Sequence, residues 1–261
     1  MNKIALAPTS LPNAEPMEYV GAAAKAGYEA IGLRVFRSPG NTYPFHPVVD
    51  DPNLARDVKK AIADSGMEVV DVLSFYMQPE TDFGAMMKPL EFGKEIGATY
   101  ALVIGDDPDW NRMVDRFGRF CELAANLGMI AAIEAPVVRR EINTTAKAVK
   151  LIKDSGRSNG VVCIDPLHFY RLGETPDVLK GTDPKLFPYT QITDGPLEGA
   201  RCALGAGGAP IHGILDQLTP GLPLSLEWQP PRDPSPTHEE WAKHILVECK
   251  AYLYAYYASK K

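Results

Sequence analysis

Cysteine and histidine are both scarce in this sequence of 261 residues, with 4 and 5 copies respectively. The cysteines are scattered, and no two of them form a Cys-X-X-Cys pair. They are Cys121, Cys163, Cys202 and Cys249. We therefore expect neither a disulfide framework nor a zinc site built on thiolates.

Positive charge is also in the minority, because 27 lysines and arginines face 33 aspartates and glutamates and the net charge is -6. Nucleic acids and anionic membranes are bound by basic surfaces, which such a protein does not offer. No uncharged apolar run reaches the roughly 18 residues of a transmembrane helix, and the first residues enter a strand-like segment without a signal-peptide core. We expect a cytoplasmic protein with no membrane and no nucleic-acid partner.

Short apolar runs alternate along the chain with helical patterns, as in repeated βα units with a parallel sheet. The expected strands cover residues 3–8, 30–35, 68–75, 100–105, 130–136, 160–166, 188–194 and 223–228. Nearly continuous apolar strands indicate a sheet covered on both faces, and the chain is close to the roughly 250 residues of an α/β barrel. The sequence predicts a single-domain (β/α)8 TIM barrel over residues 1–261.

The expected helices lie between these strands, and several close on a glycine at the C-cap position. They cover residues 17–27, 53–66, 88–97, 110–128, 145–156 and 211–218. The proline-rich residues 229–241 are expected to form a final loop before a C-terminal helix, where Thr237 and Glu240 match a capping box.

Oxygen-bearing side chains close the last four expected strands. Glu134 ends the fifth, Asp165 the sixth, Gln191 with Asp194 the seventh, and Glu227 the eighth. All strand C-termini of such a barrel point to one face, so these side chains are expected to converge over its mouth. The carboxylates of Glu134, Asp165 and Glu227 and the amide carbonyl of Gln191 are hard oxygen ligands, which suit Mg²⁺, Mn²⁺ or a similar divalent ion. Taken singly, a carboxylate of this set is also compatible with a helix cap or an ion pair.

The segment VVCIDPLHFYRLG, residues 161–173, places Asp165 and His168 just after an apolar run. Two interpretations are open for this segment on its own. Asp165 is either a metal ligand, with a histidine facing the same cavity from the loop, or a helix cap beside a surface histidine. A histidine side chain can donate or accept a proton at neutral pH, which suits contact with a substrate oxygen.

Five segments carry a resemblance to a known superfamily in their order and spacing. They are IEAP (133–136), IDPLHFYRLGETP (164–176), QITDGP (191–196), RCALGAGGAPI (201–211) and LPLSLEW (222–228). They resemble the xylose-isomerase-like TIM-barrel superfamily, which holds sugar isomerases and epimerases, inosose dehydratases, 3-dehydroshikimate dehydratases and apurinic endonucleases. The resemblance covers the whole barrel and is specific in its C-terminal half.

The resemblance implies roles for individual residues. Glu134, Asp165 and Glu227 match carboxylates that are metal ligands in the superfamily. His168 matches the histidine of the DxxH motif, which contacts substrate, and Arg201 matches an arginine that commonly binds substrate as well.

Two departures from the superfamily pattern lie near the seventh expected strand. Gln191 stands where ketose 3-epimerases have a histidine as the fourth ligand, and glutamine occurs there in some dehydratase-like members. The loop usually written PGxG reads LGAGG at residues 204–208. With Gln191 as the fourth ligand, the expected cofactor is one divalent ion, Mn²⁺, Mg²⁺ or Co²⁺.

Two more residues are candidates for substrate contact. Arg34 would bind an anionic group, and Trp228 would stack on a sugar face. Each has a plain alternative, as a surface arginine and as a packed aromatic of the barrel rim. Arg139, Arg140 and Glu141 are expected to form an ion-pair cluster at the rim without a catalytic role.

The predicted function is that of a metal-dependent sugar or sugar-phosphate isomerase or epimerase acting on a small polyhydroxy carbonyl compound. Glu134 and Glu227 would remove and return the proton beside the carbonyl through a metal-stabilised enediolate. If a hydroxyl leaves instead, the same site is that of a dehydratase of the inosose or 3-dehydroshikimate type, with His168 as the acid.

Two other classes of protein fit the sequence less well. A DNA-repair endonuclease on this scaffold would need further histidine ligands and a basic groove, which 5 histidines and an acidic balance do not supply. A catalytically idle barrel would have no chemical need for both Glu134 and Glu227. We expect a small-molecule substrate, and the sequence leaves a homo-oligomer open.

Overall fold

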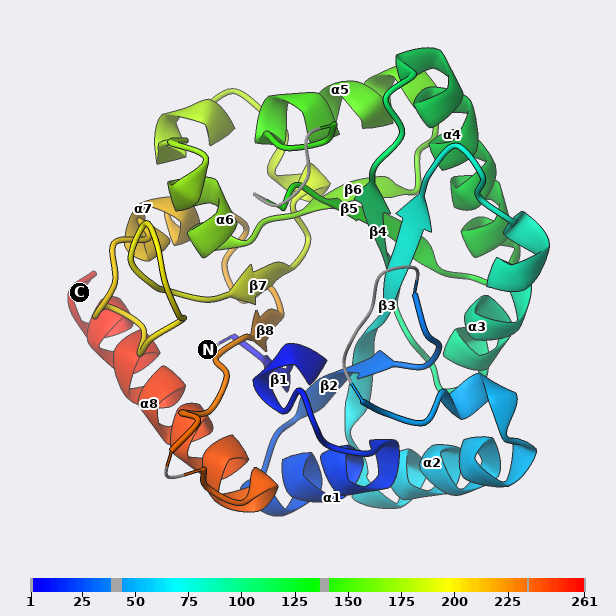
Figure 1. Ribbon diagram of the computed structural model, residues 1–261. Helices are drawn as coiled ribbons and strands as arrows, with labels where there is room; N and C mark the ends of the chain where they lie inside the picture. The colour runs from blue at the N-terminus through cyan, green and yellow to red at the C-terminus, as the bar shows by residue number, and fades with distance from the viewer. Residues whose placement is uncertain (1, 39–43, 137–140, 234, 261) are drawn as a thin grey trace.

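Eight parallel strands alternate with helices in the computed structural model, which describes residues 2–38, 44–136, 141–233 and 235–260. The strands are β1 (Ile4–Leu6), β2 (Ala30–Arg34), β3 (Glu68–Met77), β4 (Tyr100–Gly105), β5 (Ile130–Glu134), β6 (Gly160–Cys163), β7 (Thr190–Ile192) and β8 (Leu224–Leu226). They form a nearly closed TIM barrel in a single domain, as predicted (Figure 1). Arg139 and Arg140, predicted to join a rim cluster, lie outside the described residues.

Seven neighbouring pairs of strands are joined by ladders of hydrogen bonds, whereas β6 and β7 are joined by an isolated bridge. The paired strands follow the order β6-β5-β4-β3-β2-β1-β8-β7. Between β6 and β7, an isolated parallel bridge joins Ile164 to Thr190, and the Gln191 amide donates to the Ile164 carbonyl at 2.9 Å. Because all strands run in one direction, their C-terminal ends share one rim.

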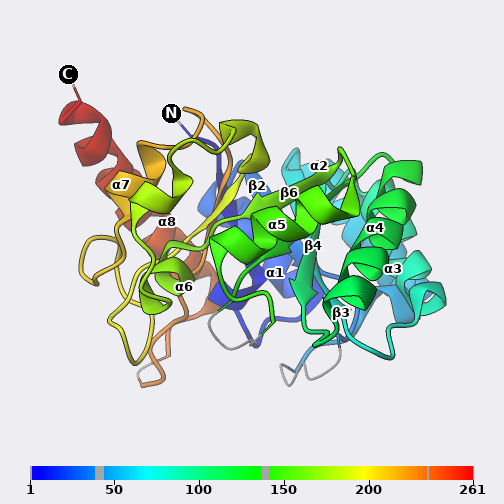
Figure 2. The ribbon, with the colours of Figure 1, turned by 90° about the horizontal axis from the view of Figure 1, so that it is seen from above.

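The helices form an outer ring around the strands, which Figure 2 shows from a second direction. They are α1 (Pro16–Ala26), α2 (Pro52–Ser65), α3 (Phe83–Glu95), α4 (Trp110–Asn126), α5 (Thr145–Ser155), α6 (Pro166–Arg171), α7 (Ile211–Leu215) and α8 (His238–Ala258). Short 3-10 helices lie at Pro8–Ser10, Val48–Asp50, Pro176–Leu179 and Pro184–Leu186. Within the described residues, no helix combines the length and the apolar character that a membrane span requires.

Several helix ends follow the local chemistry that the sequence predicts. The helices α1, α2 and α5 each end at a glycine in the left-handed region, with φ of 85° at Gly27, 70° at Gly66 and 64° at Gly156. Glycine adopts this conformation at no steric cost, which is why these residues end helices. The helix α8 begins at the predicted capping box, in which Thr237 and Glu240 each accept a hydrogen bond from the other's backbone N–H group.

Two helices differ from the sequence-based prediction. The helix α3 begins at Phe83 and not at residue 88, because the Asp82 carboxylate accepts hydrogen bonds from two backbone N–H groups of its first turn. The residues after β6, expected to be a loop, form the short helix α6. Its N-cap is Asp165, and Pro166 occupies the first position, where a proline is tolerated.

Along a strand, successive side chains point alternately towards the surrounding helices and towards the barrel interior. In β5, Ala131 and Ile133 belong to the core between strands and helices, whereas Ala132 packs inside the barrel. The two-residue period of a strand therefore turns Glu134 towards the inside as well. The apolar interior thus carries a carboxylate at its C-terminal rim.

Candidate active site

Glu134 is the last residue of β5, and its register partner on β6 is Cys163. The residue is buried, with 7% of its surface exposed. Burial is the largest cause that raises the pKa of Glu134 well above its ordinary value, and the negative charges of Asp165 and Glu227 raise it further. A carboxyl group in these surroundings needs a proton or a cation beside it.

Asp165 uses its two carboxylate oxygens differently. Oδ1 caps α6 by accepting hydrogen bonds from the backbone N–H groups of Leu167 at 2.8 Å and His168 at 2.9 Å. Oδ2 is buried and has no hydrogen-bond partner among the described residues. The helix-cap interpretation is therefore confirmed for one oxygen, and the metal-ligand interpretation stays a prediction for the other.

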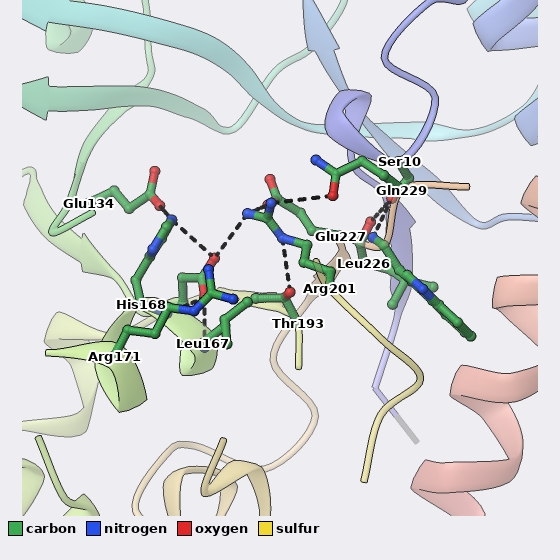
Figure 3. A network of polar contacts seen from close by, with 12 residues as sticks. Ser10, Glu134, Leu167, His168, Arg171, Thr193, Arg201, Leu226, Glu227 and Gln229 are labelled. Atoms are coloured by element: carbon green, nitrogen blue, oxygen red, sulfur yellow. Dashed lines mark hydrogen bonds and ion pairs between the residues drawn. The ribbon is translucent and has the colours of Figure 1, made fainter. Parts of the chain in front are cut away.

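His168 lies in the first turn of α6 and faces the same carboxylates (Figure 3). Its Nε2 is 3.7 Å from Glu134 Oε1 and 3.8 Å from Asp165 Oδ2. The side chain is only 14% exposed, so it is not the surface histidine of the alternative interpretation. The three residues each offer one ligand atom, all within 4.8 Å of one another. The assignment of His168 to the substrate, and not to the metal, stays a prediction.

Arg201 reaches the site from the loop after β7 and binds Glu227 (Figure 3). Its Nη2 is 2.7 Å from Glu227 Oε2 and 3.9 Å from Asp165 Oδ2. Its Nε donates to Thr193 Oγ1 at 3.1 Å, and its Nη1 donates to Gln229 Oε1 at 3.4 Å. These contacts hold the guanidinium group against one side of the carboxylate cluster.

Gln191 and Glu227 line the inner wall formed by β7 and β8. Gln191 is 2% exposed, and its register partner is Ser225. Glu227 is 4% exposed and follows two residues after Ser225. Side chains two positions apart on a strand face the same side, so Gln191 lies one layer further into the barrel than Glu227.

The two remaining substrate candidates are engaged in packing contacts. The guanidinium carbon of Arg34, at the end of β2, lies 5.5 Å from the centre of the Phe45 ring. Trp228 packs edge-on against Trp241, with ring centres 5.1 Å apart, and its ring centre is 5.6 Å from that of His244. These contacts favour the packed-rim alternative for Trp228. The substrate roles of both residues stay predictions.

Asp194 departs from its expected position. Its carboxylate accepts hydrogen bonds from backbone N–H groups of the loop that follows β7, at distances from 2.7 Å to 3.2 Å. The expectation that Asp194 converges with the other oxygen ligands over the mouth is therefore wrong, because its oxygens are occupied within the loop.

Sequence reasoning missed Asp71, a β3 residue inside the barrel that is 1% exposed. The Tyr189 hydroxyl donates to its Oδ2 at 3.2 Å, whereas its Oδ1 has no partner among the described residues. Burial is the main cause that raises the pKa of Asp71 to about 7. Gly32 makes room for Oδ1, since a Cβ there would lie 2.2 Å from it. The available signal was a carboxylate within the apolar run 68–75.

The donor set suits a hard divalent cation. The carboxylates of Glu134, Asp165 and Glu227 are buried, and the Asp165 Oδ2 accepts no hydrogen bond in the described part of the chain. Buried anionic oxygens without donors are costly, and a cation beside them would remove that cost. Carboxylate and amide oxygens suit Mg²⁺ and Mn²⁺, and an imidazole nearby is compatible with other divalent ions. The residues present therefore fit one divalent ion.

This chain is similar to a known protein family and to a curated enzyme. The family model for the xylose isomerase-like TIM barrel matches residues 20–247. The 3-dehydroshikimate dehydratase of Pseudomonas aeruginosa is 24% identical over an alignment of 253 residues, and the match covers 85% of this chain and 37% of that protein. The chain thus spans well under half the length of this curated relative.

Solved structures share the fold at low sequence identity. The structure of the IolI protein with a bound zinc atom has a TM-score of 0.79 and 17% identity, and the match covers 97% of this chain and 99% of that one. The structure of D-psicose 3-epimerase in the presence of D-fructose has a TM-score of 0.69 and 18% identity, with 92% and 89% covered. Likeness at this identity shows the fold alone, whereas the family model covers most of the chain. The chain belongs to the xylose isomerase-like TIM barrel family.

Proposed function

We propose that this protein is a metal-dependent isomerase or epimerase of a small polyhydroxy carbonyl compound, such as a sugar or sugar phosphate. The observation that carries the proposal is the pair of buried glutamates, Glu134 at the end of β5 and Glu227 directly after β8. Removing a proton from one face of a carbon and returning it to the other needs two such groups. The epimerases among the structural relatives support this class of reaction.

The proposed ion is Mn²⁺, Mg²⁺ or Co²⁺, held by Glu134, Asp165, Gln191 and Glu227. When bound, it would act as a Lewis acid that polarises the substrate carbonyl and makes the adjacent C–H group acidic. One glutamate then accepts the proton from carbon, and the other gives a proton back to the opposite face. Arg201 holds the Glu227 carboxylate in place through the 2.7 Å ion pair.

A dehydratase is the second candidate, and the observation that favours it is the position of Arg201 beside the carboxylates. A guanidinium group binds a carboxylate well, so Arg201 suits an anionic cyclic substrate. In this reaction a glutamate removes the proton, the electron pair of the C–H bond forms a C=C bond, and the hydroxyl takes a proton from His168 and leaves as water. The 3-dehydroshikimate dehydratase relative supports this alternative.

Deuterium uptake paired with ultraviolet absorbance separates the two reactions. We expect the protein, assayed with Mn²⁺ in D₂O against ketoses, inososes and 3-dehydroshikimate, to place solvent deuterium in the product and in recovered substrate. An epimerase returns a proton to carbon and forms no conjugated product, so absorbance should stay constant. Rising absorbance without label in recovered substrate would replace the first proposal with the dehydratase. Turnover that survives removal of the ion by a chelator contradicts both.

His168→Ala is expected to lower turnover by at least about 10²-fold, because a group that transfers a proton contributes about 10²–10⁴ to the rate. The affinity for Mn²⁺ should remain close to that of the wild type, since the proposal places this imidazole against substrate. Steady-state rates and Mn²⁺ titration calorimetry on the same preparation measure both quantities. Loss of the ion in this variant would make His168 a ligand, as its distances to Glu134 and Asp165 also allow.

A further inference from the structure

The loop that follows β7 is organised around the carboxylate of Asp194, which is 1% exposed. Its Oδ1 accepts hydrogen bonds from the backbone N–H groups of Gly195 at 2.7 Å and Ala209 at 3.0 Å. Its Oδ2 accepts from those of Gly205 at 2.8 Å and Gly207 at 3.2 Å. A carboxylate has about four acceptor positions, so these bonds leave none for a metal ion or a substrate.

At two glycines of this loop, Gly207 and Gly208, the backbone passes too close to a neighbouring side chain to leave room for a Cβ atom. A Cβ at Gly207 would lie 2.2 Å from Asp194 Oδ1, and a Cβ at Gly208 would lie 2.5 Å from the Tyr170 side chain. On the outer edge, Arg171 of α6 donates to two loop carbonyls at 3.0 Å and 2.8 Å. The loop is therefore held from inside by Asp194 and from outside by α6.

This loop carries Arg201. The next residue, Cys202, donates its backbone N–H to the Asp194 carbonyl at 3.0 Å, so the backbone beside Arg201 is tied to Asp194 as well. The Arg201 side chain is 18% exposed and reaches Glu227 at 2.7 Å. Holding a long side chain in one geometry costs conformational entropy, and an ordered loop lowers that cost.

We propose that Asp194 is the positioning residue of Arg201. Its charge gathers backbone N–H groups from both ends of the loop, and the ordered loop keeps the guanidinium group beside Glu227. Asp194 acts through Arg201 and does not touch the reacting atoms. Without the charge, buried N–H groups lose their acceptors, which loosens the loop and releases Arg201.

Trypsin digestion tests the release of Arg201 without reference to any reaction. Asp194→Asn keeps the size of the side chain but removes its charge and one acceptor. We expect cleavage between Arg201 and Cys202 at least about tenfold faster than in the wild type, since proteolysis follows the population of the open loop. The products are identified by mass spectrometry. Unchanged cleavage at Arg201, or equal acceleration at every trypsin site, overturns the proposal.

Glu174→Gln is the matched control for this digestion. The Glu174 carboxylate is part-buried, and it likewise accepts hydrogen bonds, from the Thr145 backbone N–H at 3.0 Å and from the Thr145 hydroxyl at 2.9 Å. It fastens the start of α5, and in the described part of the chain its hydrogen bonds go to Thr145 and not to the Arg201 loop. Its loss should leave cleavage at Arg201 unchanged, and faster cleavage there would overturn the specific role of Asp194.

Mn²⁺ titration distinguishes the release of Arg201 from the direct electrostatic effect of losing the Asp194 charge. This experiment rests on the proposed function, because it assumes the metal site. Removing the negative charge of Asp194 would by itself weaken cation binding. Releasing Arg201 from Glu227 instead removes a competing positive charge, so Asp194→Asn should bind Mn²⁺ several-fold more tightly than the wild type. The double variant with Arg201→Ala should bind no more tightly than Arg201→Ala alone. Weaker binding by Asp194→Asn overturns the inference, whereas a wild type that binds no Mn²⁺ contradicts the proposed function and leaves the digestion to decide.

Discussion

Replacing Asp165 with asparagine is expected to weaken Mn²⁺ binding by at least about 100-fold while α6 stays capped, because even partners outside the ligand set contribute about 10–100-fold to metal affinity. An asparagine keeps one oxygen for the capping bonds to Leu167 and His168. It puts an uncharged NH₂ group, which cannot bind a cation, in the place of the Asp165 Oδ2, which accepts no hydrogen bond among the described residues. Titration calorimetry measures the affinity, and thermal unfolding of the metal-free protein measures the fold.

Asp82→Asn is the matched control, since the Asp82 Oδ1 caps α3 in the same way. It accepts hydrogen bonds from the N–H groups of Gly84 at 2.8 Å and Ala85 at 3.3 Å. This variant should bind Mn²⁺ like the wild type. Unchanged affinity in Asp165→Asn would show that Asp165 is not a ligand, and unfolding of that variant alone would show a structural carboxylate.

Asp71→Asn is expected to change the pH dependence of stability. The pKa of Asp71 is raised to about 7 in the folded protein, mainly by burial. The unfolded chain has the ordinary value of about 4, so the folded state binds one more proton between these limits. The contribution of Asp71 to the free energy of unfolding therefore falls by about 1.4 kcal/mol per pH unit as the pH rises through this window.

The asparagine variant lacks this contribution, because its side chain is neutral throughout. Relative to Asp71→Asn, the wild type should lose about 3 kcal/mol of stability between about pH 5 and pH 8. Urea unfolding of the metal-free proteins at both pH values measures the difference. A difference that does not vary with pH would mean that Asp71 keeps one protonation state throughout.

Asp216→Asn serves as the control for this comparison. Asp216 is ion-paired with Lys260 and hydrogen-bonded by Tyr256, and these contacts lower its pKa. Its carboxylate is therefore ionised in both the folded and the unfolded chain above about pH 5, so its replacement should shift stability equally at both pH values.

Features with local signals could be predicted from the sequence. The order of strands and helices follows from the apolar runs, and the ends of helices follow from glycines such as Gly27 and from the Thr237 capping box. Glu134 and Glu227 could be placed near the barrel mouth because they stand at the ends of apolar runs; in the structure Glu134 ends β5 and Glu227 directly follows β8. The short helix α6 escaped prediction because six residues do not show a helical period.

Contacts between distant segments could not be predicted from these local signals. The partner of Asp71 is Tyr189, which is 118 positions away in the sequence, and the partner of Arg201 is Glu227, which is 26 positions away. Asp194 stands at the end of an expected strand like the candidate ligands. Its side chain turns to the backbone of its own loop, a choice that depends on the folded path of residues 195–209.

The strands β6 and β7 are joined by an isolated bridge and not by a ladder of paired residues. Neighbouring strands such as β4 and β5 share a continuous ladder, whereas this seam depends on the bridge from Ile164 to Thr190. Asp165 and Gln191 are the next residues on either side of that bridge. An ion bound by both side chains would link β6 to β7. Metal binding would then also stabilise the pairing of these two strands against local unfolding.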